Sequence, residues 1–135
     1  MSAFNTMCET LEKEIEESYL EGVTADKAEK LAGQFLHAQL RVSAELRKAD
    51  LDSRMRKSGL KALRAGVYTD VCTKNEKKPT EAGIAAIIDC HEVVQAEQDR
   101  FDNAEVSRDD LERYYNIFQA AHVHFRTIAK GQFGG

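Results

Sequence analysis

The fold is decided by residues 24–74, which read TADKAEKLAGQFLHAQLRVSAELRKADLDSRMRKSGLKALRAGVYTDVCTK. Thr24 followed by Asp26 is a typical helix start, because a Thr side chain caps free N–H groups and an acid suits the first turn. Apolar residues then recur at steps of three and four, and the first proline of the chain is Pro79. The stretch therefore predicts one long helix with a basic middle.

The length of this helix bears on how the chain assembles. A straight helix of fifty residues would be about 75 Å long, whereas a compact chain of 135 residues has a radius of gyration of about 14 Å. The apolar stripe also weakens over 50–59, and Gly59 and Gly66 lie within it. Either the helix breaks near 52–59 or 66, or the protein is an extended oligomer. We favour an oligomer, with or without a bend in the helix.

Two further helical regions flank the long one. Residues 1–22 predict a short acidic helix that ends at Gly22, a residue suited to that position. A polar turn around Pro79 precedes Thr80, which can start a second long, acidic helical region over 80–131. That region is either one helix or two, with a candidate interruption at 102–106, a stop at Gly131 and a flexible tail over 132–135.

Together these regions predict one all-α domain over 1–135. Segments that flank a short loop are usually antiparallel neighbours, so we expect a long antiparallel helical hairpin with a short N-terminal helix. Its apolar stripes would pack in a coiled-coil manner and assemble into a homo-oligomer. The composition, 42% hydrophobic and 31% charged with a single proline, agrees with a soluble helical protein.

The cysteines and the hydropathy predict a location. Three cysteines are present, an odd number without a CxxC pair, which indicates reduced thiols. The sequence shows no hydrophobic signal segment and no apolar run long enough to span a bilayer. We therefore expect a cytoplasmic protein with no membrane partner.

No pattern in the chain predicts an enzyme, a metal site or a cofactor. The four histidines occur without the Glu-x-x-His pairs of di-iron bundles, and no phosphate-binding glycine loop or nucleophile elbow is present. His91 and His122 fall on apolar stripes, where a histidine with a satisfied ring nitrogen in a core or interface is the simpler interpretation. We expect no catalytic residue, no metal and no cofactor.

Charge is distributed unevenly although the net charge is only −4. Residues 41–64 hold eight Lys or Arg and three acids, whereas residues 81–113 hold ten acids and three Arg. Arg47, Arg54 and Lys61 are spaced by seven, and Lys57, Lys61 and Arg64 by four and three, so both series follow one side of a helix. The candidate nucleic-acid-binding residues are Arg47, Lys48, Arg54, Arg56, Lys57, Lys61 and Arg64. Such a surface binds phosphates with strong salt dependence and little sequence preference.

Two other interpretations of the charges remain open. The basic run can pair with the acidic helices of the same chain or of a neighbouring subunit, which would make the protein a structural or adaptor oligomer without nucleic-acid binding. Alternatively, the acidic region can imitate DNA phosphates and inhibit a DNA-binding protein, in which case changes at Glu97, Asp99 and Asp102 should alter the function.

The layout of the chain resembles that of a known family. Its basic middle reads RMRK at 54–57 and KALRAGVY at 61–68, its polar turn TKNEKKPTE at 73–81, and its aromatic and basic finish FQAAHVHFRTIAKG at 118–131. This order of segments is similar to the UvsY-type recombination mediators of tailed bacteriophages. The chain differs from them in its acidic second helix and its glycine-rich tail.

The resemblance implies a phage-encoded, all-α, ring-like oligomer that binds single-stranded DNA and acts in the host cytoplasm. It also implies that the protein helps a recombinase displace single-strand-binding protein, so both proteins are expected partners. The positions that match the family's DNA-contacting part are Arg54, Arg56, Lys57, Lys61 and Arg64. Sequence and resemblance together predict a non-enzymatic recombination accessory that binds single-stranded DNA.

Overall fold

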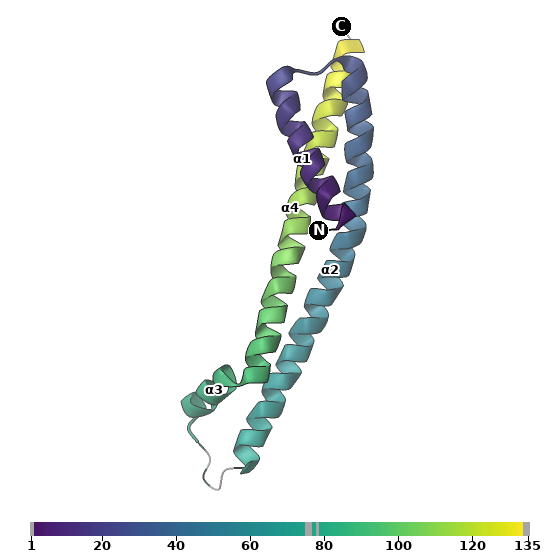
Figure 1. The fold of residues 1–135 in the computed structure, drawn as a ribbon. Helices are drawn as coiled ribbons and strands as arrows, with labels where there is room; N and C mark the ends of the chain where they lie inside the picture. The colour runs from purple at the N-terminus through teal and green to yellow at the C-terminus, as the bar shows by residue number, and fades with distance from the viewer. Residues whose placement is uncertain (1, 75–76, 78, 134–135) are drawn as a thin grey trace. The chain divides into compact units, whose positions relative to one another are not determined.

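A computed structural model describes residues 2–74, 77 and 79–133. These residues form four helices and no strand: α1 (Ala3–Glu21), α2 (Ala25–Lys74), α3 (Glu81–Cys90) and α4 (Glu92–Phe133). Figure 1 shows them in order of colour along the chain. The predicted all-α class is confirmed, and α2 runs to Lys74 with no break near 52–59 or 66.

Local signals in the sequence set most of the helix ends. Gly22 ends α1 with a φ of 80°, a left-handed backbone conformation that favours glycine, and its N–H donates to the Ser18 carbonyl. The Thr24 hydroxyl accepts a hydrogen bond of 3.2 Å from the backbone N–H three residues later. Thr80 caps α3 in the same way, at 3.1 Å.

The acidic region forms two helices, but the break lies at His91 and not at the predicted 102–106. His91 has an extended backbone, with a ψ of 125°, and its N–H donates to the Ile88 carbonyl. On a continuous helix Ile88 and Val94 would be turned about 120° apart. The break lets both side chains join one apolar cluster. Residues 102–106 contain no glycine or proline, so α4 continues through them.

The end of α4 also differs from the prediction. Gly131 does not stop the helix, which continues to Phe133. One glycine costs a helix about 1 kcal/mol relative to alanine, which is too little to end a helix of this length by itself. The predicted tail at 132–135 therefore loses its first two residues to α4, and residues 134–135 lie outside the described residues.

The chain divides into two compact units. The first unit consists of Met1–Leu46 and Asp110–Gly135, so α1 packs there with the first part of α2 and the last part of α4 (Figure 1). Phe35 is fully buried, with its ring centroid 5.7 Å from that of Phe118 and 5.6 Å from that of Phe125. Side chains of α1 cover this cluster, including Met7 and the buried Cys8.

The second unit is the continuous stretch Arg47–Asp109. Its apolar cluster joins the three helices of the unit and consists of Leu60, Val67, Ile84, Ile88 and Val94. These side chains are aliphatic and smaller than the rings of the first unit. Elsewhere in the unit, the buried Ser53 hydroxyl donates to Glu105 at 3.3 Å, and Arg108 contacts both Glu105 and Asp50. The second unit therefore replaces part of an apolar core with a polar layer.

Candidate nucleic-acid interface

All seven predicted nucleic-acid-binding residues lie on α2 within the second unit. Seven residues are nearly two helical turns, so Arg47, Arg54 and Lys61 are each turned only about 20° from the one before. Lys57 and Arg64 lie one turn from Lys61 on the same side. These five residues, which we call the basic stripe, occupy about 100° of the helix circumference.

The other two predicted residues do not belong to the basic stripe. Lys48 follows Arg47 directly and is therefore turned about 100° from it. Arg56 is turned about 140° from Lys61. Because α2 is a regular helix through this region, it does not bring Lys48 and Arg56 onto the side that carries the stripe.

Three of the predicted arginines form ion pairs. Arg54 Nη2 lies 2.9 Å from Asp50 Oδ2, and the Arg54 side chain stays 78% exposed. Arg56 Nε lies 3.2 Å from Asp52 Oδ2. In both pairs the acid lies one turn earlier on the same helix, and exposed pairs of this kind contribute less than about 1 kcal/mol. They leave the arginines accessible to other anions.

Arg64 is the member of the stripe that contacts the acidic region. Its Nη2 atom lies 2.8 Å from Asp89 Oδ1 on α3. Lys57, Lys61 and Arg47 are exposed, and in the described part of the chain no ion pair joins any of them to a carboxylate. Among the described residues, pairing with the acidic helices therefore engages Arg64, at one end of the stripe.

Three acids of α4 contact arginines of α4 itself. Arg100 pairs with Glu97, and Arg108 pairs with Glu105 at 3.3 Å and with Asp109 at 3.2 Å. The hydrogen bond to Asp109 and the charge of Glu105 raise the pKa of Arg108. Arg108 also contacts Asp50, at 4.0 Å. In this contact the base lies on α4 and the acid on α2. It therefore does not neutralise a basic residue of α2.

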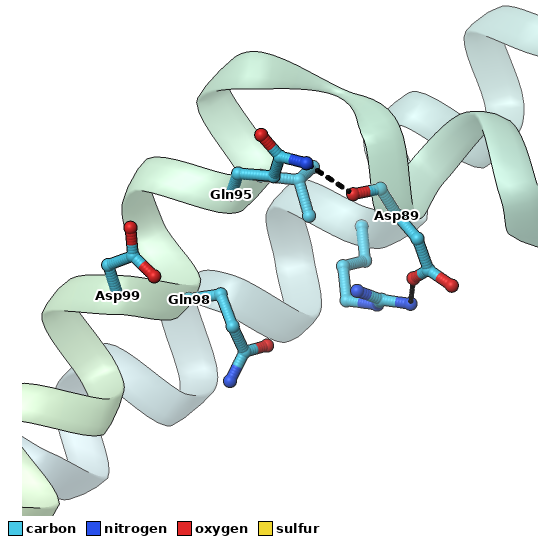
Figure 2. Close-up of a pocket in the computed structure, with 6 residues that line it drawn as sticks. Asp89, Gln95, Gln98 and Asp99 are labelled. Carbon is cyan, nitrogen blue, oxygen red and sulfur yellow. Dashed lines mark hydrogen bonds and ion pairs between the residues drawn. The ribbon is translucent and has the colours of Figure 1, made fainter.

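An open hollow of about 430 Å³ lies beside Arg64. Its lining consists of Arg64, Asp89, Val94, Gln95, Gln98 and Asp99. Figure 2 shows Gln95 reaching toward Asp89, where its Nε2 donates to the Asp89 carbonyl at 3.2 Å, while Gln98 and Asp99 point to different sides. The polar groups do not converge on one point, so this hollow extends the polar surface next to Arg64 and does not form an enclosed ligand site.

Sequence reasoning missed the two amides of this hollow. Gln95 and Gln98 are three residues apart on α4, so their shared side of the helix was readable from spacing alone. Spacing does not reveal their proximity to Arg64, because Arg64 lies on α2 and Asp89, which contacts both Arg64 and Gln95, lies on α3.

The predicted histidine environments can be checked in part. His122 is half-buried, and its Nδ1 lies 2.9 Å from the Ala32 carbonyl oxygen, which confirms a satisfied core histidine. His91 lies at the junction of α3 and α4, and among the described residues its buried Nδ1 has no hydrogen-bond partner, so the prediction of a satisfied ring nitrogen is wrong for His91. Within the described ranges, no group of three or more His, Cys, Asp or Glu is placed to hold a metal ion.

The described helices also answer one question about membranes. None of them combines the length and the apolar character that a bilayer-spanning segment requires.

Comparisons with known proteins identify no relative of this chain. No family model matches the chain, and no curated protein or solved structure is significantly similar to it.

Proposed function

We propose that this protein is a non-enzymatic accessory factor that binds single-stranded DNA through the basic stripe of α2. The observation that supports this most is the exposure of Arg47, Lys57 and Lys61 on one side of one helix, with no carboxylate paired to them in the described ranges. A set of unpaired cations in a line attracts a polyanion whose charges also lie in a line.

The dimensions of the stripe suit a strand of several nucleotides. Arg47 and Lys61 are about 21 Å apart along the helix axis at 1.5 Å per residue. A stacked strand rises about 3.4 Å per nucleotide, so this distance corresponds to about six phosphates. The cations would neutralise phosphates without contacting base edges, which gives salt-sensitive binding with little sequence preference.

The process and the partners of this function come from the resemblance to UvsY-type mediators. We infer a role in phage recombination in the host cytoplasm, with a recombinase and a single-strand-binding protein as protein partners. We also infer a homo-oligomer, because several basic stripes on one strand would add their weak affinities through effective concentration.

Fluorescence anisotropy with labelled oligo-dT tests the DNA-binding proposal. We expect micromolar binding at low salt and a steep loss of affinity as salt rises. The double substitution Lys57→Gln and Lys61→Gln should weaken binding about tenfold and reduce the salt slope by about 1.4, since each lost contact to a single strand contributes about 0.7.

The matched control is Lys27→Gln with Lys30→Gln, which removes the same charge from exposed positions of α2 in the first unit. It should change the affinity less than about twofold if binding is local to the stripe. Absence of binding at low salt would overturn the proposal. Equal weakening by the two double variants would show attraction to general charge and would remove the stripe as the binding site.

A further inference from the structure

The second unit exposes aliphatic side chains on the sides of α2 and α4 that face away from its apolar cluster. Leu51 and Met55 on α2 are 60% and 65% exposed, and Val106 on α4 is 60% exposed. Leu51 is turned about 180° from the buried Leu60, and Val106 about 160° from the buried Ala104. Neither side can be covered by the core of the same unit.

Charges of opposite sign surround these two aliphatic positions at the same offsets. Leu51 has Arg47 four residues before it, Lys48 three before it and Arg54 three after it. These positions are its neighbours on the helix surface. We call this group, with Met55, the basic face.

The corresponding neighbours of Val106 are acidic or neutral. Asp102 lies four residues before it, Asn103 three before it and Asp109 three after it. All three are exposed, and Asp99 lies one turn further along the same side. We call Asp99, Asp102, Val106 and Asp109 the acidic face.

We propose that the basic face of one copy of this protein binds the acidic face of a second copy. The occupant is a second copy because one chain carries both faces, each with an exposed aliphatic centre and a rim of one charge. Burial of Leu51 against Val106 would remove both from water, while the rims attract each other. This inference names the contact of the homo-oligomer proposed above and rests on that part of the proposal only.

The charges also decide the symmetry of the contact. Two basic faces repel each other, as do two acidic faces, so pairing of like faces is disfavoured. A contact between unlike faces is heterologous, and each copy can then carry a neighbour on either face. Assembly would therefore continue beyond a dimer.

DNA binding and this contact share Arg47 and Arg54 but otherwise use different parts of α2. Lys61 is turned about 80° from Leu51, and Lys57 about 120°. Both lysines lie outside a contact that is centred on Leu51, whereas Arg47 and Arg54 lie at its edge. An assembled copy would keep Lys57 and Lys61 accessible to a DNA strand.

Sedimentation velocity of the full chain without nucleic acid tests the inference. We expect self-association at low salt that weakens as salt rises. Reversal of the basic face by Arg47→Glu with Arg54→Glu should weaken self-association at least about tenfold, because two acidic faces then oppose each other. Reversal of the acidic face by Asp102→Lys with Asp109→Lys should do the same.

The decisive measurement is sedimentation velocity of an equimolar mixture of the two charge-reversed proteins. One protein then has two acidic faces and the other two basic faces, so the mixture should associate about as strongly as the unchanged protein. Rescue by mixing also shows that both variants fold. A monomeric unchanged protein, unaffected self-association in either reversed protein, or a mixture that stays dissociated would each overturn the inference.

The outcomes separate this inference from the DNA-binding proposal. Self-association with rescue but no binding to oligo-dT would support the contact and refute DNA binding. A monomer that binds oligo-dT would refute the contact and leave the DNA-binding proposal standing.

Discussion

The two units of this protein are both helical, but their cores differ in size and composition. The first unit buries three phenylalanine rings of α2 and α4. Side chains of α1, which lies alongside both helices in Figure 1, pack against this cluster. The second unit has a smaller aliphatic cluster and a polar layer around Ser53. The comparison indicates that the first unit has the larger apolar core, while the second combines a smaller core with buried polar contacts.

The largest effect is expected from the core of the first unit. Phe118→Ala removes a fully buried ring that contacts Phe35 and Tyr114. Loss of a buried aromatic ring costs about 3–5 kcal/mol of unfolding free energy. Urea unfolding followed by circular dichroism measures it. Val123→Ala, at an exposed position five residues further along α4, should cost less than about 0.5 kcal/mol. Similar costs for the two variants would contradict the packing of this unit.

A smaller effect is expected from the core of the second unit. Ile84→Ala removes a buried side chain of α3 and should cost about 2–4 kcal/mol. Hydrogen exchange should show faster exchange in α3 and the adjoining part of α4. The control Ile87→Ala lies on the same helix at an exposed position and should cost much less. If Ile87→Ala cost as much as Ile84→Ala, then α3 would be packed through a different face.

The polar layer should contribute less than either core. Ser53→Ala removes the hydroxyl that donates to Glu105, and a hydrogen bond of this kind contributes about 1 kcal/mol. Ser58→Ala, at an exposed position of the same helix, is the matched control. A stability gain in Ser53→Ala would show that burial of the hydroxyl costs more than its hydrogen bond returns.

The smallest effect concerns the thiol of the first unit. Burial raises the pKa of Cys8 above its ordinary value of 9.0, and the charge of Glu12 adds to this while Arg41 opposes it. A raised pKa in the folded state means that stability is complete below pH 9 and falls as pH rises through the folded value. Urea unfolding between pH 7 and 10 should show a decline that Cys8→Ser reduces.

The reactivity of the three cysteine thiols can be used to compare how easily each unit opens. Cys90 is exposed, Cys72 is half-buried beside the second cluster, and Cys8 is buried in the first. A thiol reagent at neutral pH should therefore modify Cys90 first, Cys72 next and Cys8 last. If Cys8 reacted before Cys72, the first unit would open more easily than the second, and the comparison between the units would be reversed.

Much of the fold was readable from the sequence because helical periodicity is a strong signal over long stretches. Gly22 and Thr80 also marked real helix ends. The break at His91 was missed because no glycine or proline marks it. The break brings Ile88 and Val94 into one apolar cluster. This is an effect of tertiary packing, which local sequence signals do not reveal.

The candidate site was readable only where spacing along one helix decides it. The spacing of Arg47, Arg54 and Lys61 predicts a line of cations, and α2 is a regular helix there. Lys48 and Arg56 are turned away from this line, because nearness in sequence does not place residues on one side of a helix. The contact of Arg64 with Asp89 joins different helices, which no spacing rule can predict.

The division into units has a consequence for synthesis on the ribosome. The second unit is one continuous stretch, whereas the first needs both Met1–Leu46 and Asp110–Gly135. Phe35 emerges early but finds Phe118 and Phe125 only after most of the chain has been made. A nascent chain that stops before residue 110 therefore leaves Phe35 without its partner rings, as a target for chaperones. The better-packed unit is completed last, and premature termination would damage it most.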